Sequence, residues 1–209
     1  MRTRLLKMLP LLAAFASLGA HASVIRSGFD TDLEGWTSFD GGSEVHVASG
    51  GNPSGYLEMT DVGLGSMQAI APSAFLGNLT AYLGGALSFD ALQSNQDSSD
   101  WGGFGTVRLS NGGLTAVLDI APDGAPGGSW NTYSAALDPA LWSGDSLSAV
   151  LANLTGISIE LEDHDGVSEV VGFDNFTLTS ARTEVPEPGT LALLAGAGLV
   201  AGLRRRRRG

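Results

Sequence analysis

The chain has 209 residues, of which 43% are hydrophobic, and it contains 22 acidic residues, 11 basic residues and no cysteine. Residues 23–183 hold 20 of the acidic residues against only three arginines, a formal charge of −17. Such a region repels phosphates, which excludes nucleic acid and anionic lipid surfaces as its partners. The lack of cysteine excludes a fold held by disulfides, so this region needs a packed core of its own.

The first 22 residues have the pattern of a secretory signal peptide. Three basic residues supply a positive start, an apolar stretch runs from Leu9 to Leu18, and Ala20-His21-Ala22 offers small residues to signal peptidase. The alternative is an N-terminal membrane anchor, for which the apolar run is too short. We predict that signal peptidase removes residues 1–22 and that the exported chain begins at Ser23.

Residues 23–181 are predicted to form one all-β domain. Short apolar runs with alternating polar residues are separated by glycine-rich turns, which is typical of antiparallel strands. The expected strands lie at 43–48, 56–59, 86–92, 106–109, 114–120, 130–137, 157–161 and 170–178. Asn111-Gly112 is a hairpin signal, and residues 146–153 have the spacing of a short helix. The pattern predicts a jelly-roll-like antiparallel β-sandwich.

The large aromatic side chains fall into two groups according to their surroundings. Trp36 at a strand start, and Trp130 and Tyr133 within a strand, are predicted to lie in the core. Trp101 and Trp142 stand among turn residues, where exposed rings can stack on the apolar faces of sugars. These two tryptophans are the candidate glycan contacts. The alternative is that both rings pack beneath loops.

Acidic residues gather near the start of the domain, at Asp30, Asp32 and Glu34, and again in the stretch 160–165. Asp174 in the last expected strand can join the first group, because the first and last strands of such sandwiches often neighbour each other. Carboxylates suit calcium, although neither group has the spacing of an EF-hand loop. We predict a structural calcium ion on Asp30, Asp32 and Asp174. The alternative is that both groups are solvated acidic loops.

The domain contains no recognisable catalytic motif. Its two histidines, His46 and His164, have no metal-ligand spacing, and neither a nucleophile elbow nor a phosphate-binding glycine loop is present in a suitable setting. A carboxylate pair for glycoside hydrolysis stays open as an alternative, because the sequence does not give the separation of carboxylates in space. We therefore expect a protein that is not an enzyme.

The C-terminal end has three elements in a fixed order. Val185-Pro186-Glu187-Pro188 cannot continue a helix, because each proline lacks an amide donor and restricts the residue before it. We predict a linker over 182–188, a transmembrane helix over 189–203 and a cytoplasmic tail over 204–209. The helix would span about 22 Å, short of the roughly 30 Å bilayer core. The residues that stop it on the cytoplasmic side are Arg204, Arg205, Arg206, Arg207 and Arg208.

This order resembles the PEP-CTERM sorting signal of Gram-negative bacteria. A basic stop-transfer anchor would explain the apolar run and the arginines but not the Val-Pro-Glu-Pro. The resemblance implies recognition by a membrane-embedded exosortase and a transient stay in the inner membrane. It also implies delivery of the domain to the cell surface or extracellular matrix of a host that makes exopolysaccharide.

A second resemblance covers most of residues 29–180. The ordered segments are DTDLEGWTSFDGG, GNPSGYLEMTDVG, IAPSAFLGNLTAYLGGALSFDAL and VLANLTGISIELEDHDGVSEVVGFDNFTL. They are similar to the laminin B domain, also called laminin type IV. The resemblance implies a β-sandwich related to galactose-binding-like and carbohydrate-binding modules, with a structural or adhesive role and no catalytic residues. The disulfide-rich repeats that accompany the domain in laminin are absent, so laminin-specific partners are not implied.

Together, these features predict an exported structural or adhesive protein associated with exopolysaccharide or biofilm matrix. The first alternative is a carbohydrate-binding module with a specific glycan ligand, and the second is a secreted glycan-active hydrolase. The expected partners are signal peptidase, exosortase and extracellular polysaccharide.

Overall fold

The structure, a computed structural model, describes residues 22–39, 42–61, 63, 65–94, 102–122, 124–164 and 169–181. The predicted signal peptide lies outside these residues except for its last residue, Ala22, and the predicted sorting motif, membrane helix and arginine tail lie outside them entirely. Within the described part of the chain, no helix combines the length and the apolar character needed to cross a bilayer.

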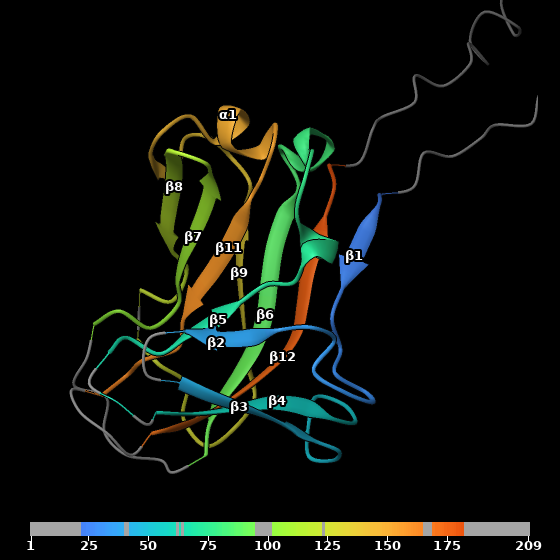
Figure 1. The fold of residues 1–209 in the computed structure, drawn as a ribbon, viewed down its shortest axis with the longest axis vertical. Helices are drawn as coiled ribbons and strands as arrows, with labels where there is room; N and C mark the ends of the chain where they lie inside the picture. The colour runs from blue at the N-terminus through green and yellow to red at the C-terminus, as the bar shows by residue number, and fades with distance from the viewer. Residues whose placement is uncertain are drawn as a thin grey trace, which may run out of the picture. The chain divides into compact units, whose positions relative to one another are not determined.

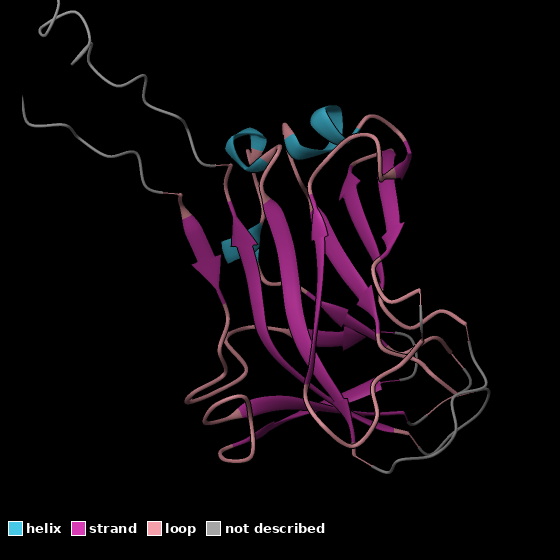
Figure 2. Cartoon of the chain, turned by 180° about the vertical axis from the view of Figure 1, so that it is seen from behind, coloured by secondary structure: helices cyan, strands magenta, loops and turns pink. Residues whose placement is uncertain are grey.

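Strands make up almost all of the regular secondary structure of the described domain, and loops connect them (Figure 2). They are β1 (Val24–Arg26), β2 (Thr37–Phe39), β3 (Gly42–Val47), β4 (Tyr56–Asp61), β5 (Gln68–Ile70), β6 (Ala86–Gln93), β7 (Thr106–Asn111), β8 (Leu114–Asp119), β9 (Asn131–Ala136), β10 (Ser143–Gly144), β11 (Gly156–Glu160) and β12 (Val170–Thr179). Two 3₁₀ turns lie at Ser73–Phe75 and Thr80–Tyr82, and the helix α1 at Leu147–Leu151. The predicted short helix and the hairpin between β7 and β8 are confirmed.

The strands form two sheets that pack as a sandwich (Figure 1). The first sheet has the order β3-β4-β12-β6-β9, with β1 also paired to β12, and the second has the order β10-β8-β7-β11-β5-β2. Every pairing among these strands is antiparallel. This confirms the predicted all-β sandwich, and β1 beside β12 confirms that the first and last strands are neighbours.

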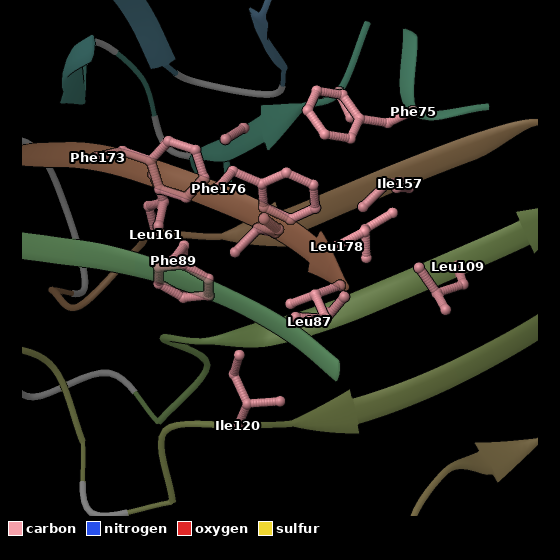
Figure 3. Packing of buried hydrophobic residues seen from close by; sticks show 14 of the residues in the cluster. Phe75, Leu87, Phe89, Leu109, Ile120, Ile157, Leu161, Phe173, Phe176 and Leu178 are labelled. Carbon is pink, nitrogen blue, oxygen red and sulfur yellow. The ribbon is translucent and has the colours of Figure 1, made fainter. Parts of the chain in front are cut away.

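The hydrophobic core fills the space between the sheets, and Figure 3 shows side chains of both sheets turned toward one another. Alternation puts Ile157, Ile159 and Leu161 inside, as the sequence predicts. Trp36 is 1% exposed, and its indole N–H donates a 2.8 Å hydrogen bond to Ser27 Oγ, which satisfies the polar end of the ring. Four phenylalanine rings surround Trp36, with ring centroids 4.9–6.2 Å from its own: Phe29, Phe75, Phe173 and Phe176.

A β-bulge in β12 lets two aromatic residues that stand an odd number of positions apart both point into this core. Between Asp174 and Thr177, β12 carries one residue more than β6 opposite it. Asn175 has φ of +54°, a left-handed conformation that asparagine tolerates better than most residues. Phe173 and Phe176 are therefore both buried although they stand three positions apart.

Strand β3 shows the predicted alternation, but its polar side chains face inward. Glu44 accepts a 3.1 Å hydrogen bond from a backbone amide of β2, and His46 donates from Nε2 to the carbonyl of Phe29 at 2.8 Å. Val45 consequently faces outward with 51% of its surface exposed, and Val47 lies on the same side of the strand. Polar contacts with other segments outweigh the apolar pattern in this edge strand.

We expect Trp36→Ala to lower the free energy of unfolding by about 3–5 kcal/mol, because it empties the centre of the aromatic cluster. Urea unfolding of the full-length chain in a mild detergent measures this change. Leu114→Ala, at a side chain that is 38% exposed, serves as the control and should alter stability by less than about 0.5 kcal/mol. Equal stability of the two variants would contradict the core position of Trp36.

Candidate functional site

The outer face of the first sheet brings together side chains from four strands. Pairing places Val45 of β3 beside Glu58 of β4. Gly172 of β12 lies between Glu58 and Leu92 of β6. Glu58 and Leu92 alternate with buried residues of their own strands, so they face away from the core, and Gly172, which pairs with both, lies on the same face. The missing side chain at Gly172 leaves room for larger groups in the middle of this row.

Tyr56 and Trp130 occupy that room. Their rings meet edge to face, with centroids 5.4 Å apart and planes at 79°. A Cβ atom at Gly172 would lie 2.9 Å from the Trp130 ring and 3.2 Å from both the Tyr56 ring and the Leu92 side chain. Glycine is thus required for the two rings to approach the sheet this closely. We call Tyr56, Trp130, Gly172, Leu92 and Val45 the aromatic strip.

Hydrogen bonds fix both rings of the aromatic strip. The Trp130 indole N–H donates to the carbonyl of Gly50 at 2.9 Å, and the Tyr56 hydroxyl donates to Glu58 Oε2 at 3.0 Å. Burial and then the Glu58 carboxylate raise the pKa of Tyr56 above its ordinary value. Both rings are half-buried, so each is held from one side and open to solvent on another.

A buried polar network lies in the next row of the same face. Asp90 accepts hydrogen bonds from Thr132 Oγ1 at 2.6 Å and from the side-chain amides of Asn52 at 3.0 Å and Asn175 at 2.6 Å. Asp174 accepts from the backbone amides of Asn52 at 2.7 Å and Asn175 at 2.6 Å. Asp90 is 5% exposed and Asp174 is fully buried.

Every carboxylate oxygen of Asp90 and Asp174 therefore has a donor. Burial raises the pKa of Asp174 to about 6; the amides of Asn52 and Asn175 act against this shift, and the Asp90 charge adds to it. Arg26 also lowers the pKa of Asp174, and its guanidinium donates to Asn175 Oδ1. The network holds the turn around Asn52 and the bulge of β12 against the sheet.

The structure gives no support to the predicted calcium set of Asp30, Asp32 and Asp174. Among the residues it describes, no three acidic or histidine side chains are placed to hold a metal ion. Asp30 and Asp32 are exposed, and Asp32 accepts a 2.7 Å hydrogen bond from the amide of Glu34 in its own loop. Both oxygens of Asp174 accept hydrogen bonds from the backbone amides of Asn52 and Asn175.

The tryptophan assignments need two corrections. Trp142 is only 7% exposed and donates its indole N–H to the carbonyl of Ala136 at 3.0 Å, so its ring packs beneath a loop, as the alternative to a glycan contact has it. Trp130, expected in the core, lies on the outer face. Tyr133 does pack against the core, with its ring stacked on that of Phe89 at 5.4 Å. Trp101, the other candidate, lies outside the described residues.

Comparison with known families identifies two regions of the chain. Residues 69–193, more than half of the chain, match the family model described as Laminin B (Domain IV). Residues 184–208 match the PEP-CTERM protein-sorting motif, which contains the predicted Val185-Pro186-Glu187-Pro188. No curated protein matches the chain in sequence.

Two solved structures share the fold. The L4b domain of human laminin alpha-2 has a TM-score of 0.59 and 10% identity, covering 77% of this chain and 98% of that one. The family 11 carbohydrate-binding module of the cellulosomal cellulase Lic26A-Cel5E of Clostridium thermocellum has a TM-score of 0.51 and 19% identity, covering 76% and 96% respectively. At these identities the likeness concerns the fold alone.

We expect Gly172→Ala to lift Trp130 from the sheet, because the added Cβ would lie 2.9 Å from the ring. Acrylamide should then quench more of the tryptophan fluorescence than in the parent chain. Trp130→Phe in the same background should cancel the increase. Gly113→Ala, where a Cβ meets nothing within 4 Å, is the matched control. Identical quenching of all the variants would show that Gly172 does not seat the ring.

Proposed function

Because the chain belongs to the laminin B (domain IV) family and carries a PEP-CTERM sorting motif, we propose that its domain is an adhesive component of the extracellular matrix that binds glycan through the aromatic strip. The sorting motif makes the chain an exosortase-sorted protein, exported to the surface of a Gram-negative bacterium. Exopolysaccharide is then the polymer that the domain meets on delivery.

The observation that carries this proposal is the Tyr56–Trp130 pair over Gly172. A sugar ring presents an apolar C–H face, which an aromatic ring can cover, and an edge of hydroxyl groups that need polar partners. Glu58 lies beside the pair with one oxygen already fixed by Tyr56, so its position is set before a ligand arrives. Such a fixed arrangement lowers the entropy cost of binding.

The charge of the domain favours a neutral glycan. Residues 23–183 carry a formal charge of −17, and Glu58 adds a carboxylate at the aromatic strip itself. A polyanionic polysaccharide would be repelled, most strongly at low salt. The fold supports the same class of ligand, since one structure that shares it is named a carbohydrate-binding module.

The polar network beside the aromatic strip favours binding over hydrolysis. Glycoside hydrolysis needs one carboxylic acid and one carboxylate that are free to act on the substrate. Asp90 and Asp174 are instead buried, and amide or hydroxyl donors occupy all their oxygens. Their role in this proposal is to hold the face in shape.

We expect Trp130→Ala and Tyr56→Ala each to weaken glycan binding about tenfold, since a stacked ring contributes about 1–2 kcal/mol. Affinity electrophoresis of the full-length chain through gels containing a neutral β-glucan, a neutral galactan or polyanionic alginate measures the effect. Phe39→Ala, which removes an aromatic ring 59% exposed on the second sheet, should bind like the parent.

Unchanged melting temperatures would show that both strip variants remain folded. Retention of every variant equal to that of the parent would rule out the aromatic strip as the binding face. If no neutral polysaccharide retards the parent chain in the gel, the proposal that the domain binds a neutral glycan is wrong.

Sorting is tested separately from binding. Deleting Val185 to Gly209 should leave the domain soluble in the periplasm, because it removes both the recognition motif and the predicted membrane segment. Replacing Pro186-Glu187-Pro188 by alanines should trap an uncleaved, membrane-bound precursor. Cell fractionation with immunoblotting separates these forms, and surface display of both variants at the parental level would contradict exosortase sorting through this motif.

A further inference from the structure

A second group of carboxyl side chains is buried where β4 ends and β12 begins. Asp61, Glu162, Asp163 and Glu169 are each 4% exposed or less, and we call them the acid cluster. Asp61 is the last residue of β4, Glu162 and Asp163 follow β11, and Glu169 directly precedes β12. The solvated loop that was the alternative for the stretch 160–165 is therefore wrong for Glu162 and Asp163.

Each carboxyl of the acid cluster is held by an amide through one of its oxygens. The Gly63 amide donates to Asp61 Oδ1 at 2.9 Å, and the Met67 amide donates to Glu162 Oε2 at 2.8 Å. The side-chain amide of Gln93 donates to Asp163 Oδ2. Glu169 Oε2 accepts from the backbone amides of Asp163 at 2.8 Å and His164 at 3.0 Å. Three buried oxygens have no donor among the described residues: Asp61 Oδ2, Asp163 Oδ1 and Glu169 Oε1.

The titratable groups around these oxygens are mostly acidic, together with His164, whose ring nitrogen Nε2 is also buried. The charges that act on Glu169 are Asp163 and Glu162, and those that act on Glu162 are Asp61, Glu160 and Asp163. On the neighbouring strand, the Asp61 amide donates to the Glu169 carbonyl at 3.1 Å, which sets the two residues opposite each other. Like charges at such positions destabilise a sheet, and the burial of carboxylates adds to the cost.

A bound cation or a bound proton can remove this repulsion. Within the described part of the chain, no three acidic or histidine side chains are placed to hold a metal ion. A proton needs only two oxygens. The backbone amide of Asp163 donates to Glu169 Oε2 at 2.8 Å, which holds the Glu169 carboxyl beside Asp163, and each of the two side chains keeps one buried oxygen without a donor among the described residues. We propose that Asp163 and Glu169 share one proton in the folded domain, and that this proton fastens the start of β12 to the segment after β11.

The protonation equilibrium agrees with this geometry. Burial, followed by the contact with Asp163, raises the pKa of Glu169 from 4.5 to about 9. Burial also raises the pKa of Glu162 to about 6. The folded chain therefore keeps a proton that the unfolded chain releases. This contribution to stability is fully present below pH 4.5 and is lost as the pH rises toward 9.

Glu169→Gln tests the shared proton, because the glutamine amide donates to Asp163 at every pH while its oxygen still accepts from the backbone amides. The melting temperature of the full-length chain in mild detergent should fall between pH 5 and pH 9, and the variant should lose most of this fall. At pH 9 the variant should melt at least about 3 °C above the parent. Glu58→Gln, which removes a charge on the outer face, is the matched control and should follow the parent.

Carbon-13 NMR of the parent chain, labelled at the glutamate carboxyl groups, gives a readout that needs no variant. One glutamate should titrate above pH 8, and Asp163→Asn should shift that titration. Titration of every glutamate below pH 7 would overturn the proposal. A calcium-specific rise in melting temperature at pH 9, absent with magnesium and absent in Glu169→Gln, would also overturn it, since a cation would then neutralise the cluster.

Discussion

In a regular β-strand, successive side chains point to opposite faces of the sheet, so two residues three positions apart face opposite ways. The core nevertheless contains both Phe173 and Phe176 of β12. The bulge between them resolves this conflict by adding one residue opposite β6. The added residue, Asn175, points its amide at Asp90 on the outer face. The aromatic core and the polar network on the opposite side of the sheet are thus two consequences of one irregularity, which explains why β12 contributes to every important part of the domain.

The sequence predicts the fold wherever burial alone determines the pattern. Residues 157–161 and the second half of β12 alternate as a strand with one buried face requires, and both lie within strands that the sequence predicts. Strand β3 shows the limit, because Val45 is exposed while His46 is turned inward by the carbonyl of Phe29. That carbonyl belongs to a loop outside the strand pair, and a local pattern cannot register such a partner.

The candidate site was missed for a related reason. Tyr56 and Trp130 are far apart in the sequence, and only the register of β4, β12, β6 and β9 brings them over Gly172. Turn residues around Trp142 suggested an exposed ring, but the chain folds back so that the ring covers the core and its N–H reaches β9. The one local indication of the site in the sequence was Gly172, because a glycine within a strand often marks a place where a large group lies close to the backbone.

The strongly acidic composition resolves into different physical roles once the structure is known. Asp32 accepts a hydrogen bond from an amide in an exposed loop. Asp90 and Asp174 instead accept hydrogen bonds through all their carboxylate oxygens, which stabilises the outer face of the first sheet. In the acid cluster, by contrast, amides supply only part of what the buried carboxyls need. Glu169 lies three residues before Gly172. The start of β12 therefore connects the buried carboxyl of Glu169 directly to the glycine on which the rings of the aromatic strip rest. The net charge of such a domain therefore describes its long-range repulsion of anions, while its folded shape depends on the few carboxyls that solvent does not reach.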